Sequence, residues 1–283
     1  MKRIENLTLD EERALYGLEQ AEISACTFAG PADGESALKE TRDLTVTDCQ
    51  FLLRYPLWHT RRAVLTSCTM TDTCRAALWY DQDVTMENCR LGGIKVLREC
   101  DRSILRNCDI VSQEFAWFCR GVEMTDCELQ SEYPFLQSCD LKLNGLQMKG
   151  KYSFQYVENA ELHNCKLDTK DAFWHSRNVT VYDSEIKGEY LAWHSENLHL
   201  VRCRIIGTQP LCYARGLVLE DCEMVDCDLS FEKSEVQATI RGCVDSVKNP
   251  VQGRIEAGHI GEVILDEPTS CEIISRVPQA ECA

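Results

Sequence analysis

Cysteine recurs along this chain at a regular interval, and this spacing limits the possible folds more than any other feature of the sequence. The interval from Cys49 to Cys68 is repeated from Cys89 to Cys108 and from Cys108 to Cys127. Internal repeats of about this length, roughly 20 residues, are typical of solenoids, in which each unit buries its apolar side only by stacking on its neighbours. Ten of the 18 cysteines occupy this one column of the repeat: Cys26, Cys49, Cys68, Cys89, Cys108, Cys127, Cys165, Cys203, Cys222 and Cys243.

The residues around the cysteine column indicate β-strands and sharp corners. Two apolar residues separated by a polar one precede the cysteine, as Val84 and Met86 precede Cys89, and this period of two is that of a strand. The residue directly before the cysteine is usually Asp or Asn, which tolerate the left-handed backbone conformation of a tight bend. The second residue after it is apolar, as Leu91 is. We therefore expect the cysteine and its apolar follower to point inward.

Three short strands separated by corners close one coil per repeat, which predicts an all-β chain folded as a single-domain parallel β-helix with a period of about 19 residues. Adjacent coils should rise by about 4.8 Å, the spacing of strands within a sheet. The register runs from about residue 21 to about residue 265 and corresponds to about 12 coils. Residues 1–20 and 266–283 are then expected to cover the two open ends against edge-to-edge pairing.

Charge and hydropathy restrict the function as well as the fold. The chain has 283 residues, and its 30 basic residues against 46 acidic ones give a net charge of −16. Such a charge repels nucleic acids and anionic membranes over the whole surface. No stretch has the roughly 18 apolar residues of a membrane helix, and residues 1–17 lack the apolar core of a signal peptide. We expect a cytoplasmic protein with no nucleic-acid partner and no membrane partner.

The cysteine column is expected to be an interior ladder of reduced thiols. Buried cysteine behaves as a small apolar side chain, and disulfides are rare in a reducing cytoplasm. Cysteines on adjacent coils would be close enough for a disulfide, although parallel side-chain vectors disfavour its torsion angle. The sequence has no CxxC, HxH or HExxH motif, and Cys222 with Cys227 is a pair without further ligands at zinc-site spacing. It therefore predicts neither a metal nor another cofactor.

Aromatic residues gather in adjacent columns on the third strand of the repeat, and adjacent positions on a strand face opposite sides, so one aromatic column must point outward. All five tryptophans share one column, once a two-residue insertion before Trp79 is allowed for: Trp58, Trp79, Trp117, Trp174 and Trp193. The next column holds His59, Tyr80, Phe118, Tyr156, His175, His194 and Tyr213. The preceding column is apolar throughout and includes Leu57, Leu78, Phe135, Phe154, Phe173 and Leu211.

An outward column of aromatic rings would form a large apolar patch, which usually marks a binding groove or an oligomer interface. The apolar column favours an inward position for itself and an outward one for the tryptophans; the alternative is that the tryptophans only fill the core. Rings repeated at the coil spacing suit a neutral glycan, with each ring against one pyranose face, or a protein partner, including a second copy of this chain. The candidate ligand-binding residues are Trp58, Trp79, Trp117, Trp174, Trp193, His59 and Tyr213.

The alternative function is an enzyme, a lyase or hydrolase acting on carbohydrate in the same groove. His175 and His194 are the candidate catalytic residues, because histidine acts as an acid or base near neutral pH and stacked histidines lower each other's proton affinity. The competing interpretation is that both histidines only stack within the aromatic column. Charged residues near them in the sequence that could act as partners are Asp171, Arg177, Glu185, Glu189 and Glu196.

Four segments connect the chain to a known family: Gly30–Lys39 (GPADGESALK), Arg54–His59 (RYPLWH), Gly207–Tyr213 (GTQPLCY) and Ser246–Pro250 (SVKNP). Together with the cysteine-bearing coils between them, they resemble an uncharacterised family of bacterial parallel β-helix proteins, a domain of unknown function in the pectate-lyase-like superfamily. The resemblance covers nearly the whole chain. It implies a right-handed helix, which the period alone does not establish. It implies no catalytic residues, because fold does not determine function.

Overall fold

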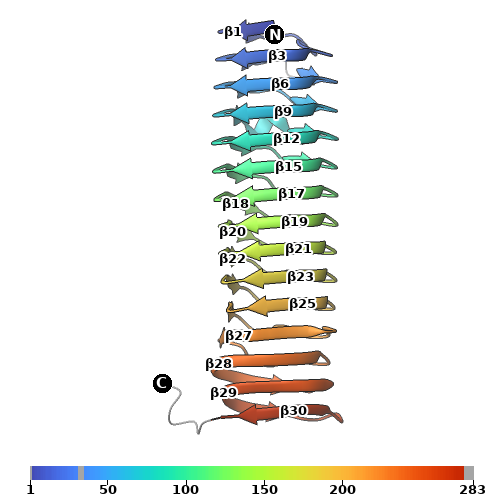
Figure 1. Cartoon of the computed structure of the whole chain (residues 1–283), viewed down its shortest axis with the longest axis vertical. Coiled ribbons are helices and arrows are strands. Elements are labelled where there is room, and N and C mark those ends of the chain that lie inside the picture. Colours follow the sequence, from blue (N-terminus) through green and yellow to red (C-terminus); the bar gives the residue numbers. More distant parts are fainter. Residues whose placement is uncertain (1, 31–34, 277–283) are drawn as a thin grey trace. The chain divides into compact units, whose positions relative to one another are not determined.

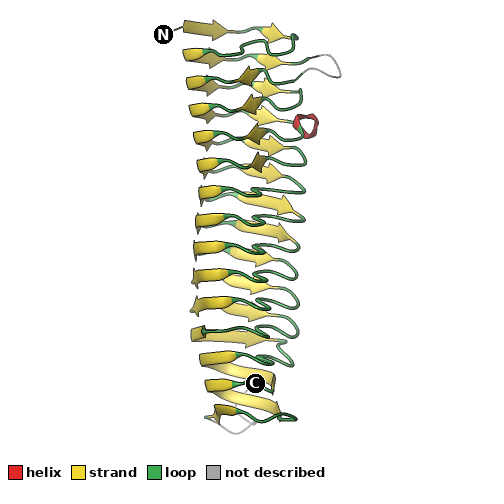
Figure 2. Cartoon of the chain, turned by 90° about the vertical axis from the view of Figure 1, so that its right-hand side faces the viewer, coloured by secondary structure: helices red, strands yellow, loops and turns green. Residues whose placement is uncertain are grey.

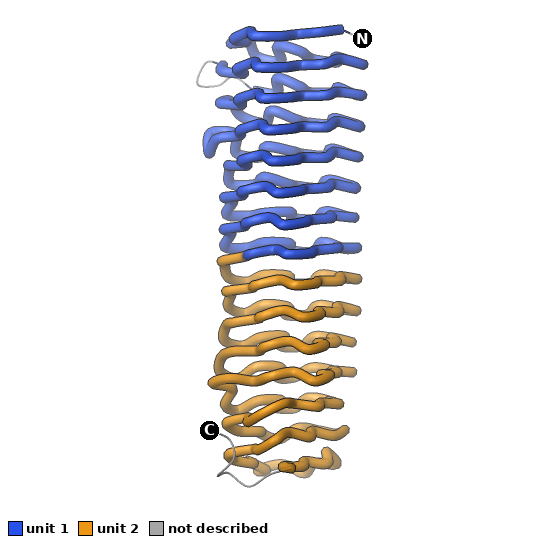
Figure 3. The backbone as a smooth tube through the Cα atoms, turned by 60° about the vertical axis from the view of Figure 1, so that its left-hand side comes forward, with its two compact units in different colours: residues 1–147 blue, residues 148–283 orange. Residues whose placement is uncertain are grey.

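The computed structural model describes residues 2–30 and 35–276, and the chain divides into two compact units, residues 1–147 and 148–283 (Figure 3). Each unit is a parallel β-helix in which the strands of successive coils lie side by side and wind in a right-handed sense (Figure 1). Among the described residues, the one helical element is a single 3-10 turn, η1 (Asp72–Cys74), in unit 1 (Figure 2). The predicted all-β solenoid with a period near 19 residues is therefore confirmed.

The first face of each coil is its longest strand, usually six residues long. Parallel pairing joins residues one repeat apart, such as Val84 with Ser103 in unit 1 and Val179 with Leu198 in unit 2. In unit 1 these strands are β1 (Lys2–Glu5), β3 (Glu19–Ser24), β6 (Arg42–Thr47), β9 (Arg61–Thr66), β12 (Gln82–Glu87), β15 (Asp101–Arg106), β17 (Arg120–Thr125) and β19 (Cys139–Asn144). In unit 2 they are β21 (Glu158–His163), β23 (Arg177–Tyr182), β25 (Glu196–Val201), β27 (Leu217–Val225), β28 (Glu235–Lys248), β29 (Gln252–Ile264) and β30 (Ser270–Ser275).

The second face carries the short strand that follows the cysteine column. In β27, β28 and β29 this strand is continuous with that of the first face. The pairing register shifts between Leu219 and Cys222 and between Ile240 and Cys243, at the position where the other coils have a corner. The separate second-face strands are β2 (Thr8–Leu9), β4 (Thr27–Phe28), β7 (Gln50–Phe51), β10 (Thr69–Met70), β13 (Arg90–Gly92), β16 (Asp109–Val111), β18 (Glu128–Ser131), β20 (Gln147–Gly150), β22 (Lys166–Asp168), β24 (Glu185–Lys187) and β26 (Arg204–Ile206).

The corner before the cysteine column has the backbone conformation that its Asp and Asn residues predict. Asn88 and Asn164 have φ values of 54° and 53°, and Asp126 has 51°, all in the left-handed region that Asn and Asp enter at low cost. Glycine is required at another bend, after β26. At Gly207 φ is 129°, and a Cβ atom would clash with the carbonyl oxygen of Gly188 on the preceding coil, so the coils can stack closely only if no side chain is present.

The cysteine column lies inside both units, as predicted. Each thiol is close to carbonyl oxygens of its own coil and of the coil before, as the Sγ of Cys108 is to Arg106 at 3.4 Å and to Met86 at 3.5 Å. Among the described cysteines, 16 are free thiols and nearly all of these are buried; Cys243 is disulfide-bonded. The thiols therefore act mainly as small apolar core groups that still satisfy weak hydrogen bonds.

The number of coils is larger than predicted, about 14 rather than about 12. The difference lies at the ends of the chain, which were expected to cover the solenoid. Lys2–Glu5 instead pairs in parallel with β3, and Ser270–Ser275 pairs in parallel with β29, so both segments are coils themselves. Residues 277–283, the rest of the expected C-terminal cover, lie outside the described residues. Short terminal coils lack the cysteine that marks the repeat, which explains why the sequence pattern missed them.

Candidate functional site

The third face of the coil carries the aromatic columns, and its structure differs from the prediction. Among the described residues, only four coils of unit 1 have a strand there: β5 (Leu38–Lys39), β8 (Leu57–Trp58), β11 (Leu78–Trp79) and β14 (Leu97–Arg98). In unit 2 the segments that include Phe173 and His175 are turns in which alternate residues are left-handed, with φ values of 61° and 54° for these two. Each left-handed residue redirects the chain, so the alternation of a strand does not apply.

This backbone places both aromatic columns of unit 2 on the outside. Ala172 and Phe173 are both buried, whereas Trp174 is half-buried and His175 is exposed. Two consecutive side chains, those of Ala172 and Phe173, thus point inward, and the next two, those of Trp174 and His175, point outward. The expectation that only one aromatic column faces outward was wrong, because it assumed extended backbone at every position.

Four rings on successive coils of unit 2 form a continuous stack, which we call the unit 2 ladder: Tyr156, His175, His194 and Tyr213. The ring centroids are 4.9 Å apart between Tyr156 and His175, and 5.0 Å apart at each of the next two steps. Tyr156 is 48% exposed, and both histidines are exposed. The sequence predicted that these residues share a column, and the structure brings them into contact.

The stacking decides which part of each ring a ligand can reach. His175 and His194 are inclined by only 9°, so their faces are turned toward one another along the coil axis. A centroid spacing of 5.0 Å leaves no room for a sugar ring between them. The ladder therefore presents ring edges, with the imidazole nitrogens and tyrosine hydroxyls on them, rather than the aromatic faces that flat sugar stacking requires.

Trp174 and Trp193 lie beside the ladder and are held firmly in place. Their rings stack with a centroid distance of 5.6 Å and an angle of 5°. The indole N–H of Trp174 donates to the carbonyl of Tyr190 at 2.7 Å, and that of Trp193 donates to the carbonyl of Gln209 at 3.0 Å. Because both side chains are half-buried and hydrogen-bonded to the backbone, they support the coils as well as forming surface.

The carboxylates predicted as partners of the histidines are engaged elsewhere. Glu185 pairs with Arg204, Glu189 with Lys170, and Glu196 with Arg177. Asp171 is buried, which raises the pKa of its carboxyl group. The imidazoles of His175 and His194 stack on aromatic rings and form no hydrogen bond or ion pair with another described residue. The arrangement of these described residues therefore lacks the carboxylate that usually orients a catalytic imidazole.

The electrostatic setting of His194 keeps its imidazole neutral. Partial burial lowers the pKa of His194, and the neighbouring His175 lowers it further. Burial disfavours the charged imidazolium, and a positive charge on His175 would repel it. At neutral pH the His194 edge therefore offers one donor and one acceptor rather than a charge. This suits an uncharged, hydrogen-bonding ligand.

A shallow hollow of about 420 Å³ adjoins the ladder, and we call it the ladder hollow. One wall is formed by His175, His194 and Tyr213 of the ladder. The remaining lining residues are polar or charged: Ser195, Glu196, Arg215 and Lys233. The sequence singled out only Glu196 among these four, as a possible partner of the histidines; the other three belong to columns without an aromatic pattern.

The aromatic residues of unit 1 are arranged differently, because cations cover the faces of the tryptophan rings. Trp58 and Trp79 stack with centroids 5.2 Å apart. The Nζ of Lys39 lies 3.8 Å from the Trp58 centroid, and the guanidinium of Arg98 lies 5.9 Å from both Trp79 and Trp117. Such cation–π contacts satisfy the ring faces within the protein.

The remaining predicted residues of unit 1 also have partners of their own. The Nδ1 of His59 is 2.8 Å from the Oε1 of Glu40, and its ring is tilted against Tyr80. The indole N–H of Trp117 donates to the carbonyl of Tyr133. The ring faces of the unit 1 column are thus largely covered, although the indole N–H groups of Trp58 and Trp79 have no hydrogen-bond partner among the described residues. His59 is exposed but already bonded to Glu40. Among the described residues, the candidate rings free of cation–π and carboxylate contacts are therefore those of unit 2.

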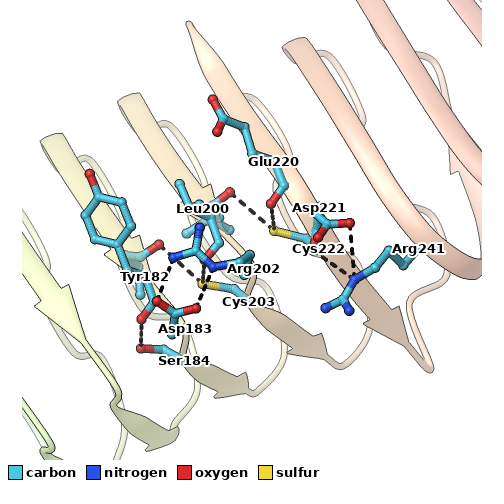
Figure 4. Close-up of polar contacts among 12 residues, drawn as sticks. Tyr182, Asp183, Ser184, Leu200, Arg202, Cys203, Glu220, Asp221, Cys222 and Arg241 are labelled. Atoms are coloured by element: carbon cyan, nitrogen blue, oxygen red, sulfur yellow. Dashed lines mark hydrogen bonds and ion pairs between the residues drawn. The ribbon is translucent and has the colours of Figure 1, made fainter.

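A second hollow of unit 2, of about 520 Å³, lies at the corner beside the cysteine column. Its arginines are already paired with carboxylates (Figure 4). Arg202 forms a bidentate pair with Asp183 at 2.6 and 2.7 Å, and Arg241 approaches Asp221 at 3.3 Å. Since these donors are used within the coil stack, this corner stabilises the fold and offers little for a ligand.

In the described part of the chain, no group of three or more His, Cys, Asp or Glu side chains is arranged to hold a metal ion. Residues 2–30 and 35–276 contain no helix that is long and apolar enough to cross a membrane.

Several solved structures share the coil architecture at low similarity. The A-module of mannuronan C-5 epimerase AlgE6 of Azotobacter vinelandii is 8% identical, with a TM-score of 0.41, over 97% of this chain and 89% of that one. The AlgE4 A-module of the same organism is 9% identical, with a TM-score of 0.36, over 84% and 88% of the chains. PfbA, a surface adhesin of Streptococcus pneumoniae, is 10% identical, with a TM-score of 0.35, over 86% and 76%.

Such values describe a likeness of fold and carry no statement about function. No curated protein sequence matches the chain. The resemblance to an uncharacterised β-helix family is confirmed by a family model that covers residues 2–275. The chain belongs to the family described as "Protein of unknown function (DUF3737)".

Proposed function

We propose that this protein binds a glycan without cleaving it, and that a largely neutral sugar chain runs along the edge of the unit 2 ladder. The observation that carries the proposal is the ladder itself: four exposed or half-exposed rings, stacked at 4.9 to 5.0 Å, that turn hydrogen-bonding edges to solvent. One coil rises by about 4.8 Å, close to the length of one sugar residue in an extended chain. Successive sugars would then meet successive ring edges.

The chemistry of the ladder favours hydroxyl groups over a flat apolar ligand. Tyr156 and Tyr213 provide phenolic hydroxyls that both donate and accept, and neutral His194 provides one nitrogen of each kind. The adjoining ladder hollow is lined by polar residues. Sugar hydroxyls are likewise donors and acceptors, so they can replace water at such edges. The net charge of −16 disfavours a polyanionic chain.

A protein partner, including a second copy of this chain, is the competing ligand class. Stable interfaces with a protein partner usually bury roughly 800 Å² of surface on each side. The ladder is narrow and ends in a polar hollow, which favours the glycan. The enzymatic alternative receives less support, because Glu185, Glu189 and Glu196 are all paired away from the histidines.

The test is to measure the binding of neutral oligosaccharides to the full chain by tryptophan fluorescence and by calorimetry. His175→Ala should weaken binding about tenfold while leaving the melting temperature within a few degrees, because an exposed side chain contributes little to stability. Phe118→Ala is the matched control: it removes an aromatic of the same column in unit 1 that is 40% exposed.

Equal effects of the two variants, or no binding by any neutral oligosaccharide, would overturn the proposal. Sedimentation analysis of both proteins distinguishes the competing class. A dimer that dissociates in His175→Ala but not in Phe118→Ala would identify the ladder as an interface between copies of the chain. Release of reducing ends from the oligosaccharides by the wild type would favour the enzyme.

A further inference from the structure

Arg215 stands out among the arginines of unit 2 because its guanidinium has no ion pair within the described residues. Its main chain is fixed, since its N–H donates to the carbonyl of Ser195 at 2.9 Å and its carbonyl accepts the N–H of Asn197 at 2.9 Å. Its side chain is exposed and lines the ladder hollow. The other arginines of the unit each pair with a carboxylate: Arg177, Arg202, Arg204, Arg241, Arg254 and Arg276.

The charged neighbours of Arg215 in the hollow form their ion pairs with other residues. Glu196 belongs to the adjacent coil, but its carboxylate lies 3.3 Å from Arg177, which also reaches Glu158 at 3.7 Å. Lys233 lies 3.3 Å from Glu267. Among the described residues, the Arg215 guanidinium therefore lines the hollow without an ion pair, and its donors can serve a single anionic group.

Ser195 supplies a second observation at the hollow, a buried hydroxyl without a partner among the described residues, and it differs from the equally unpaired Ser176 of the preceding coil in that it lines the hollow. In the same column of the repeat, Ser138 donates to the carbonyl of Ala116 and accepts the N–H of Cys119, at 2.6 and 2.9 Å. Ser195 is 1% exposed and lines the hollow, but its hydroxyl has no hydrogen-bond partner in residues 2–30 and 35–276. Buried hydroxyls are rarely left unsatisfied.

We propose that the ladder hollow binds one oxyanion group, a carboxylate or a phosphate, carried by a sugar of the bound glycan. Arg215 would form the bidentate pair that suits such groups, and the Ser195 hydroxyl would donate to the same oxyanion after rotation about its side-chain bond. The neutral edge of His194 and the hydroxyl of Tyr213 remain for the sugar hydroxyls. This inference rests on the proposed function, because the anion is attached to the ligand of the ladder.

The sign and number of charges on the glycan determine which glycans this site prefers. A chain with an anion on every sugar would meet the negative surface along the remaining coils, whereas a chain with one acidic sugar gains the contact with Arg215 and avoids most of the repulsion. The preferred ligand is thus a largely neutral glycan with an isolated acidic residue. Its extra affinity should fall with ionic strength, because the pair with Arg215 is near the surface.

The experiment compares glucose, glucuronate, glucose 6-phosphate and inorganic phosphate as probes of the full chain by calorimetry at low and physiological salt. Trp193 provides a second readout by fluorescence, since its ring lies 5.4 Å from that of Tyr213 at the hollow. Glucuronate and glucose 6-phosphate should bind about tenfold or more tightly than glucose, as expected for one charged pair with hydrogen bonds. Inorganic phosphate alone should bind no better than glucose.

Arg215→Ala should abolish the advantage of the charged sugars over glucose, while Arg215→Lys should retain part of it. Arg204→Ala is the matched control, because it removes a paired arginine of the same unit that lies outside this hollow. Equal affinity for glucose and glucuronate in the wild type would overturn this inference but not the proposed function. Inorganic phosphate that binds as tightly as glucose 6-phosphate would also overturn it, by showing that the hollow recognises a free anion.

Ser195→Ala tests the second donor, and it should reduce the advantage of glucuronate over glucose severalfold. Ser176→Ala is its matched control, because the Ser176 hydroxyl is equally buried in the same column and also has no partner among the described residues, but it does not line the hollow. The control should leave the preference for glucuronate unchanged. Equal losses in the two serine variants would overturn the assignment of Ser195 to the anion.

Discussion

The imidazole rings of His175 and His194 lie face to face, with centroids 5.0 Å apart and planes inclined by 9°. This contact between adjacent coils has two consequences. It hides the ring faces, so that ligands meet edges, and it makes protonation of one ring costly for the other. The same contact therefore shapes both the binding surface and its dependence on pH.

The coupling between these two rings should be visible in the titration of His194. Burial is the larger cause of its lowered pKa and His175 is the smaller one. His175→Gln should therefore raise the pKa of His194 only part of the way back to 6.5, as followed by NMR of the imidazole protons. His163→Gln serves as the control, because His163 stacks on Tyr182 rather than on the ladder. A full return to the ordinary histidine value in His175→Gln would show that burial has no part in the shift.

Asp81 should make the protein less stable as pH rises. Its carboxyl is fully buried, Oδ1 accepts the N–H of Thr60 at 2.7 Å, and Oδ2 has no partner among the described residues. Burial raises the pKa of Asp81 well above 3.8. The folded state then holds a proton that the unfolded state releases, so the free energy of unfolding falls above about pH 4, by up to about 1.4 kcal/mol per pH unit, until the folded pKa is passed. Asp81→Asn should remove this dependence in denaturant titrations at several pH values.

Asp83, two residues away, provides a control with the opposite sign. The Arg102 guanidinium, 2.6 and 3.0 Å from its oxygens, holds the pKa of Asp83 below 3.8. Its contribution to stability is present above pH 3.8 and is lost as the pH falls through the folded value. Asp83→Asn should therefore lower stability at neutral pH, and its difference from the wild type should disappear in acid, where the Asp83 carboxyl is protonated. Identical pH profiles for the two variants would contradict both assignments.

Trp193 should contribute to stability although its ring is only half-buried. Trp193→Phe removes the indole donor to the Gln209 carbonyl and should cost about 1 kcal/mol in thermal or urea unfolding. Trp193→Ala also removes the contact with Trp174 and should cost about 2 kcal/mol, less than the roughly 3–5 kcal/mol of a fully buried ring. His194→Ala, at the adjacent exposed position, should change stability by less than about 0.5 kcal/mol. If the Trp193 variants lost ligand binding but kept the stability of the wild type, the tryptophans would form binding surface without supporting the fold.

The free thiols should be unreactive in the native protein. Burial raises the pKa of Cys74, Cys212 and Cys227 to about 12 in each case, so almost no thiolate forms at these three positions at neutral pH. Hydrogen bonds from neighbouring column thiols instead lower the pKa of Cys49, Cys89 and Cys203, and there burial is what keeps a reagent away. Titration with a chromogenic disulfide reagent should be slow before unfolding and fast for most thiols after it. Rapid reaction of most thiols without denaturant would show that the column opens on the timescale of the assay.

The natural variation within the cysteine column indicates what that position requires. Ser184 replaces cysteine in one coil of unit 2, where its hydroxyl donates to the Tyr182 carbonyl at 2.6 Å and accepts the N–H of Cys165 at 2.9 Å. Leu146 occupies the same position in another coil and is fully buried, so the column requires an uncharged side chain that fits the interior rather than sulfur chemistry. Cys203→Ser should accordingly be tolerated better in denaturant unfolding than Cys203→Asp, which would bury a charge.

Much of the fold could be predicted from residue spacing. The regular cysteine interval, the apolar pairs such as Val179 and Val181, and the Asp and Asn corners each specify a backbone feature within a few residues. These features are local, so a solenoid built from them repeats one solution many times. The additional coils at Lys2–Glu5 and Ser270–Ser275 were missed because short terminal coils lack the cysteine of the repeat.

The candidate site depended on structure to a larger degree. The columns placed Trp174, His175 and Tyr213 on one side of the coil correctly, but assuming a strand there hid the fact that adjacent residues point outward together. The ion-pair partners of charged residues could not be predicted from the sequence either, because a pair such as Glu196 with Arg177 joins neighbouring coils and depends on side-chain conformations. Arg215 and Ser195 became candidates only when their neighbours in space were known to have partners.

The amino-acid sequence by itself determined the period, the inward cysteine column and the aromatic columns, because strand alternation and corner residues act over a few neighbouring positions. Tertiary structure alone decided that the ladder rings expose their edges and that Arg215 is left without an ion pair among the described residues. Stacking angles and ion pairs arise between coils, where left-handed residues such as His175, with φ of 54°, redirect side chains. Such geometry depends on the packing of one coil on the next, which the order of residues within a coil does not encode.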